Sequence, residues 1–159
     1  MNQDLFKLAE QLGQVLNHKG DVLVTAESCT GGWIAELVTE VAGSSAWFDR
    51  GFVTYSNSAK IEMLGVNPDT LRQYGAVSEQ TVVEMVRGAL THSHASLAVA
   101  VSGIAGPEGG TPAHPVGTVW LAWQRKHQEA VAIKKYFVGD RHQIRGQTVQ
   151  CAVEECLRR

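Results

Sequence analysis

The sequence predicts an α/β protein, a three-layer α/β/α sandwich around a mixed, mostly parallel sheet. Short apolar runs rich in β-branched residues alternate along the chain with stretches of helical apolar spacing. Glycine-rich turns follow two of the apolar runs, as expected where strands end at a ligand-binding edge. Since 159 residues is about the length of one ordinary domain, we expect a single domain over residues 1–159.

The first elements alternate helix, strand and helix. Residues 3–19 carry leucines at helical spacing, and Gly20 follows where a left-handed cap is wanted, so an amphipathic helix is predicted. Residues 22–26 are short, apolar and β-branched, which predicts a strand. Apolar residues over 34–41 return to helical spacing and stop before Gly43, which predicts a second helix.

The middle of the chain predicts a second strand over residues 48–55, followed by a short helix around residues 58–64. The polar stretch 67–75 is interpreted as a connection. Ser78 is a good N-cap for a helix whose apolar residues run to Leu90. The almost wholly apolar run 97–101 then predicts a central strand.

The last third predicts a hairpin and a terminal helix. Residues 103–110 are too rich in glycine for regular structure. Two strands are expected over residues 116–123 and 131–138, joined by the polar turn 125–129. Asp140 is placed to cap a final helix.

Charge and composition favour a small-molecule partner. The 14 Lys and Arg residues against 16 Asp and Glu residues leave a net charge of −2, so no basic surface for nucleic acid or anionic membranes is expected. No run of about 18 apolar residues or signal-peptide core occurs, so we expect no membrane span. Three cysteines without a C-x-x-C pair are typical of a reduced compartment, which predicts a cytoplasmic protein.

Ser28 is the first candidate nucleophile. It falls at a predicted strand-to-helix turn, where unpaired backbone N–H groups could hold a developing oxyanion and the following glycines permit close approach of a substrate. The alternative is that Ser28 or Thr30 simply caps the helix. Cys29 is intrinsically the stronger nucleophile, and the residues alone do not choose between it and Ser28.

A nucleophilic serine needs a base. The histidines all fall in polar segments, and the spacing of His92 and His94 points their rings to different sides, so no metal site is expected. Lys60 follows a predicted strand near the same sheet edge, and a desolvated lysine can accept a serine proton. The alternative is a solvated surface charge.

Two further features bear on ligand binding. The glycine loop lacks the Gly-Lys-Ser/Thr ending of a P-loop, which argues against nucleoside triphosphate hydrolysis. Arg141 lies in the first turn of the last helix, where a cation opposes the helix dipole. Either a bound anion or a salt bridge would explain that placement.

Six blocks of sequence, in order over nearly the whole chain, resemble the CinA C-terminal domain family. The blocks are 25–32 (TAESCTGG), 51–57 (GFVTYSN) with Lys60, 75–78 (GAVS), 102–107 (SGIAGP), 115–119 (PVGTV) and 139–141 (GDR). The resemblance implies hydrolysis of the carboxamide of nicotinamide mononucleotide to nicotinate mononucleotide and ammonia, without metal or cofactor. It also implies a serine–lysine dyad that passes through an acyl-enzyme.

Carried onto this sequence, the resemblance makes Ser28 the nucleophile and Lys60 the base, with Tyr55 helping to position them. The backbone N–H groups of Thr30 and Gly31 would then stabilise the oxyanion. Six residues would receive the nucleotide, with Arg141 binding its 5′-phosphate: Ser102, Gly103, Ile104, Ala105, Gly106 and Arg141.

One departure, two alternatives and one open question accompany this assignment. His114 precedes Pro115 where we expect a lysine in the family, which bears on a phosphate contact at the loop. A catalytically silent nucleotide-binding regulatory paralogue would keep the same pocket. A DNA-uptake partner is suggested only by the family's name and is disfavoured by the charge balance. Whether the chain forms a homo-oligomer stays open.

Overall fold

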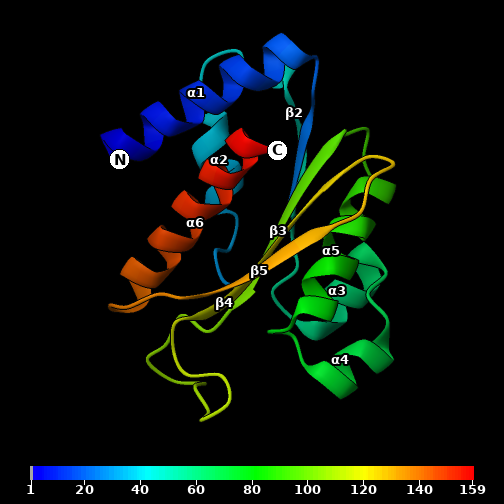
Figure 1. Ribbon diagram of the computed structural model, residues 1–159, viewed down its shortest axis with the longest axis vertical. Coiled ribbons are helices and arrows are strands. Elements are labelled where there is room, and N and C mark those ends of the chain that lie inside the picture. Colours follow the sequence, from blue (N-terminus) through cyan, green and yellow to red (C-terminus); the bar gives the residue numbers. More distant parts are fainter. Residues whose placement is uncertain (1) are drawn as a thin grey trace.

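The computed structural model describes residues 2–159 and places one five-stranded sheet between two layers of helices (Figure 1). The strand order is β2 (Phe48–Val53), β1 (Leu23–Glu27), β3 (Leu97–Gly103), β4 (Thr118–Arg125) and β5 (Val131–Tyr136). β1 pairs in parallel with both β2 and β3, whereas β4 is antiparallel to both of its neighbours. Four strands therefore run in one direction, and the predicted mixed, mostly parallel sheet is confirmed.

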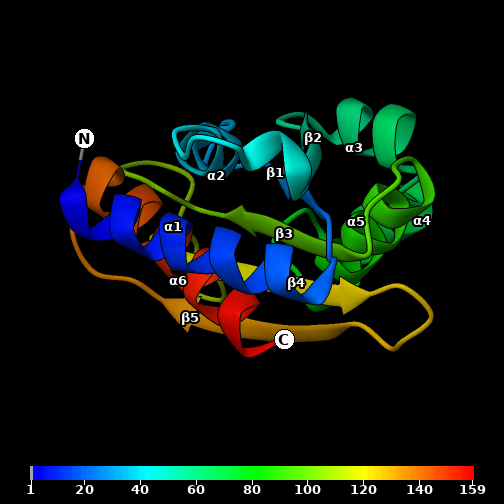
Figure 2. The same cartoon turned by 90° about the horizontal axis from the view of Figure 1, so that it is seen from above.

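Helices cover both faces of the sheet, so the three-layer prediction is also confirmed (Figures 1 and 2). One face carries α1 (Gln3–Lys19), α2 (Trp33–Thr39) and α6 (Arg141–Arg158), and the other carries α3 (Asn57–Leu64), α4 (Pro68–Tyr74) and α5 (Glu79–Thr91). A single 3₁₀ turn, η1 (Ser44–Ala46), precedes β2. Alternate residues of β3 supply the two cores, with Val99 under α6 and Ala100 under α5.

Most predicted helix ends are confirmed by their caps. Gly20 and Gly65 adopt left-handed conformations after α1 and α3. Ser78 accepts a hydrogen bond from the Thr81 N–H at the start of α5. Asp140 forms a reciprocal capping box at the start of α6. The strands β2 and β5 end two residues earlier than predicted.

The prediction of a connection over residues 67–75 is wrong, because the structure has helix α4 there. Asn67 caps the helix by accepting from the Asp69 N–H at 2.9 Å, and Pro68 occupies the first turn. Leu71 is its one buried residue. A single apolar anchor gives no visible periodicity, so the cap and the proline were the only local signals.

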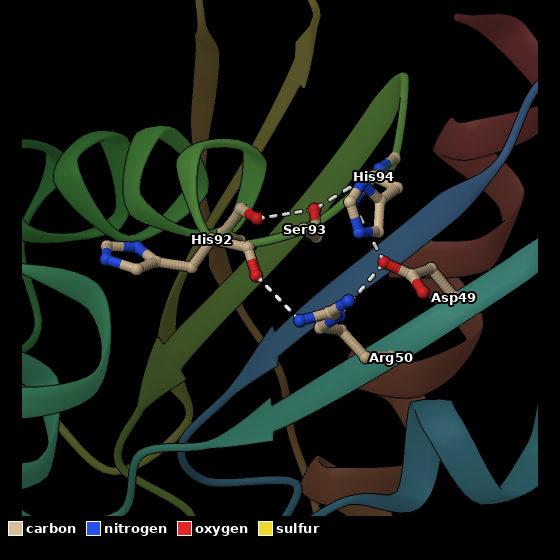
Figure 3. A network of polar contacts seen from close by, with 7 residues as sticks. Asp49, Arg50, His92, Ser93 and His94 are labelled. Carbon is tan, nitrogen blue, oxygen red and sulfur yellow. Dashed lines mark hydrogen bonds and ion pairs between the residues drawn. The ribbon is translucent and has the colours of Figure 1, made fainter.

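A polar network closes the end of the sheet opposite the carboxyl ends of the parallel strands (Figure 3). Asp49 accepts from the His94 N–H and from Arg50, both at 2.9 Å, and these bonds hold the pKa of the Asp49 carboxyl below its ordinary value. Arg50 also donates to the His92 carbonyl oxygen at 3.0 Å. The His92 and His94 rings point apart in Figure 3, and the network ties β2 to the loop before β3.

No helix in residues 2–159 is long and apolar enough to cross a membrane. The three cysteines, Cys29, Cys151 and Cys156, are unpaired.

Gly88 sets how closely α5 approaches α3. A Cβ atom at this position would overlap the Leu64 carbonyl oxygen, which is backbone and cannot rotate away. Because α3 carries Lys60 in its second turn, the missing side chain lets that lysine lie against the sheet. The close approach thus connects helix packing with the position of the candidate base.

We predict that Gly88→Ala destabilises the fold by about 1–3 kcal/mol, the usual cost of overpacking, despite the better helix propensity of alanine. Gly146→Ala is the matched control, since Gly146 lies within α6 and its added methyl would meet only the Trp33 ring at 3.3 Å. Urea unfolding of both variants measures the difference. Equal stability of the two would contradict the close contact between α5 and α3.

Candidate active site

Ser28 directly follows β1, at the carboxyl end of the parallel strands. Its N–H donates to the Val101 carbonyl oxygen at 3.1 Å, which continues the pairing with β3 by one residue. Its side chain lies on the α3 side of the sheet, and the Lys60 Nζ atom is 2.9 Å from its Oγ atom. The residue is 8% exposed, so the hydroxyl group lies at the edge of the core.

Lys60 is buried at 1% exposure, which removes the alternative of a solvated surface charge. Its Nζ atom donates to the Thr54 carbonyl oxygen at 2.7 Å as well as to Ser28. Among residues 2–159 it takes part in no ion pair, so only neutral oxygens surround it. Burial lowers the pKa of Lys60 to about 8, and an appreciable fraction is therefore neutral near pH 7.

Cys29 faces away from this pair. Its side chain belongs to the core beneath α2 and α6, and burial raises the pKa of the thiol to about 12. A thiol that stays protonated is a poor nucleophile. The geometry therefore brings Ser28, and not Cys29, together with a base.

The turn after Ser28 is closed by a hydrogen bond from the Gly31 N–H to the Ser28 carbonyl oxygen at 3.0 Å. Gly31 and Gly32 both have positive φ, 59° and 101°, which side chains rarely adopt. The Gly31 N–H, expected to serve an oxyanion, thus already has an acceptor. Within the described chain no oxygen atom accepts from the N–H groups of Cys29 and Thr30.

Glu27 organises the turn and was missed by the sequence reasoning. The buried carboxylate accepts from the Thr30 hydroxyl at 2.6 Å and from the Ile34 and Ala35 N–H groups at 2.9 and 3.0 Å. It therefore satisfies the first turn of α2 and complements the helix dipole. A charged residue at the end of an otherwise apolar strand was the available signal.

Arg145, also missed, holds the turn from the α6 side. Its guanidinium group donates to the carbonyl oxygens of Cys29 and Thr30 at 3.0 and 3.1 Å. It also lies over the Trp33 ring, 5.5 Å from the centroid. Its position one turn after Arg141, near the start of the same helix, was the only hint in the sequence.

Tyr55 and Arg141 form an arch near the glycine loop. Arg141 donates to the Gly106 carbonyl oxygen at 2.8 Å and to the Tyr55 hydroxyl at 3.2 Å. These two bonds hold the guanidinium group beside the glycine loop, and no salt bridge to a carboxylate involves Arg141 among residues 2–159. Tyr55 is 62% exposed and its hydroxyl accepts from Arg141, so its role in positioning Ser28 and Lys60 stays a prediction.

The predicted nucleotide loop begins beside Ser28. Ser102 is buried at the end of β3, and Ala105 packs into the core. The Ile104 N–H donates to the Thr118 carbonyl oxygen at 2.9 Å, which fixes the loop to β4. His114 is held farther out by a 3.0 Å bond from its N–H to the Thr111 hydroxyl.

A wide groove lies on the opposite face of the turn, and its lining does not include the dyad. It runs between α1, α2 and α6, and is lined in part by Thr30, Gly31, Trp33, His142 and Arg145. Because Ser28 and Lys60 lie on the α3 side of the sheet, this groove gives no access to their reactive atoms.

The chain is similar over nearly its whole length to proteins of one family. Residues 5–159 match the family described as the CinA C-terminal domain. The chain belongs to this family. Among curated relatives, the nicotinamide-nucleotide amidohydrolase PncC of Escherichia coli (strain K12) is 52% identical over 153 residues, covering 96% of this chain and 93% of that protein. The protein of the same name from Pseudomonas putida is 53% identical, covering 94% and 93%.

The fold of the CinA C-terminal domain is also found in solved structures. The competence/damage inducible protein CihA from Agrobacterium tumefaciens is 47% identical, with a TM-score of 0.94 over 98% of this chain and 96% of that one.

We predict that Glu27→Gln destabilises the CinA domain by about 1–3 kcal/mol, because a side-chain amide leaves one of the three donors unpaired. Glu36→Gln is the matched control, since Glu36 is exposed in the first turn of the same helix. Thermal unfolding of the two variants checks the prediction. If both variants lost a similar amount of stability, the effect would come from the interaction of a negative charge with the helix dipole and not from the hydrogen bonds of Glu27.

Proposed function

We propose that this chain hydrolyses the carboxamide of nicotinamide mononucleotide to give nicotinate mononucleotide and ammonia. The observation that carries the proposal is the 2.9 Å contact between Ser28 Oγ and the buried Nζ atom of Lys60. A serine beside a lysine of depressed pKa is suited to attack an amide at neutral pH. The substrate class is supported by the names of the two amidohydrolases, which are similar over more than nine-tenths of both chains.

In the first half-reaction the neutral amine of Lys60 accepts the Ser28 proton as Oγ attacks the carboxamide carbon. The hydrogen bond that the Lys60 amine donates to the Thr54 carbonyl oxygen orients the nitrogen lone pair toward Ser28. In this proposal the N–H groups of Thr30 and Cys29 stabilise the oxyanion, and the Gly31 N–H, which donates to the Ser28 carbonyl oxygen, would have to share its hydrogen. The Lys60 ammonium then protonates the amide nitrogen, which leaves as ammonia.

In the second half-reaction Lys60 takes a proton from water, which attacks the acyl ester on Ser28 and releases nicotinate mononucleotide. The same lysine returns the proton to the serine. No cofactor enters this scheme. The chain's own residues supply the nucleophile, the base and the oxyanion donors.

The substrate would be received by the segment from Ser102 to Gly106 and by Arg141, which already joins that segment to Tyr55. We infer that this arch closes over the nicotinamide end. We also propose that residues 1–159 act as a single domain in the cytoplasm, which the three unpaired cysteines support.

We predict that Ser28→Ala abolishes ammonia release from nicotinamide mononucleotide, because it removes the attacking atom. Cys29→Ala should retain most of the activity, since the Cys29 side chain lies in the core on the other face. A coupled ammonia assay on both variants and the unmodified protein is the test. Activity that survives in Ser28→Ala and is lost in Cys29→Ala would reverse the assignment, and an unmodified protein that binds without turnover would be a silent regulatory paralogue.

We predict that kcat/KM rises with pH until about pH 8 and then levels, because Lys60 acts only in its neutral form. Lys60→Met and Lys60→Arg should each lose at least about 100-fold in kcat, since neither can accept a proton. Melting temperatures establish that the variants fold. A profile that turns near pH 6.5, or an active Lys60→Arg protein, would exclude the lysine as the base.

A further inference from the structure

The sheet aligns four side chains in one row on the face covered by α5. Ser102 pairs with Trp120 across β3 and β4, and Trp120 pairs with Lys134 across β4 and β5. Ser28 continues the row on the other side of Ser102, because Glu27 is paired with Val101. Cross-strand partners point to the same face of a sheet. The row therefore leads from the nucleophile across the sheet to a lysine.

The Lys134 ammonium group is held over this row. It lies 5.8 Å from the centroid of the Trp120 ring and 5.2 Å from that of Tyr136. The two rings attract the cation without neutralising it. Across the described residues Lys134 forms no ion pair, so its charge is available to an anion.

The spacing of the row suits a mononucleotide. Ser28 and Trp120 are two strands apart, which is about 10 Å at the usual strand separation. Lys134 leans back over Trp120, and its ammonium group lies near the end of this span. In a mononucleotide the phosphate lies on the far side of the ribose from the ring that carries the carboxamide. A substrate whose carboxamide meets Ser28 can thus extend past the buried Ser102 and along the accessible part of Trp120 toward Lys134.

We propose that Lys134 binds the 5′-phosphate of the substrate and that Trp120 lies beneath its ribose. This inference rests on the proposed function and extends it to the recognition of the phosphate. An ammonium group and a phosphate form a charge-assisted hydrogen bond, which selects the nucleotide over its nucleoside. Arg141 was the sequence-based candidate for this contact, but its guanidinium group already donates to Gly106 and Tyr55.

Lys135 provides a matched control for Lys134. It is the next residue on the same strand and is also exposed, but it pairs with Val119, whose side chain belongs to the opposite core. A change at Lys135 alters the net charge by the same amount without touching the row.

The test is calorimetric titration of nicotinamide mononucleotide and of nicotinamide riboside into Ser28→Ala protein, which holds both ligands without turnover. We expect Lys134→Gln to raise the Kd of the mononucleotide about 10-fold and to leave that of the riboside unchanged. Lys135→Gln should change neither, and Lys134→Arg should restore affinity for the mononucleotide.

Three results would overturn the proposal. If Lys134→Gln and Lys135→Gln raised the Kd of the mononucleotide equally, the effect would come from the net charge of the protein and not from a contact with Lys134. Equal loss for mononucleotide and riboside would make Lys134 a structural residue, and phosphate-selective loss in Arg141→Ala alone would return the phosphate to Arg141. The proposed function fails separately, if unmodified protein releases no ammonia, because the binding comparison needs no turnover.

Discussion

The hydrogen bond between Lys60 and Ser28 is the contact on which the arrangement of this molecule depends. It requires an amine to be buried among neutral oxygens, which is unfavourable for a charged lysine. The parallel pairing of β1 and β2 makes the arrangement possible. The Thr54 N–H donates to the Glu27 carbonyl oxygen at 2.8 Å, and this extends the pairing beyond the strand ends to the residues that surround the amine. The docking of α3 then brings Lys60 to the same edge.

The sheet also keeps opposite charges apart. Glu27 and Ser28 are consecutive, so the alternation of a strand sends the carboxylate to the α2 face and the hydroxyl group to the α3 face. The Glu27 carboxylate accepts hydrogen bonds from N–H groups in the first turn of α2, so its negative charge is stabilised without an ion pair to Lys60. A buried glutamate on the same face would hold the amine in its charged form. With the carboxylate on the other face, burial is left as the cause that lowers the pKa of Lys60.

Local patterns in the sequence predict the layers, the sheet and most caps, because apolar spacing and glycine positions report the local backbone directly. Helix α4 was not predicted because its one buried leucine produces no helical apolar spacing. Ser28 and Lys60 could be suggested as reactive types, but their contact joins residues 32 positions apart and depends on the pairing of β1 with β2. Their pairing as nucleophile and base was predicted from the resemblance to a family and not from their spacing in the sequence. Glu27 and Arg145 act on backbone atoms of the turn, and such contacts leave little trace in a sequence.

The hairpin of β4 and β5 forms one edge of the sheet and contributes none of the reacting atoms in the proposed scheme. The residues proposed to carry the chemistry thus lie between Glu27 and Lys60, and those proposed to meet the rest of the ligand lie on β4 and β5, much later in the chain. An outer hairpin can exchange side chains, or lengthen its turn, without moving the inner strands that hold the dyad. Evolution could in this way change the compound that is recognised while retaining one means of cleaving an amide.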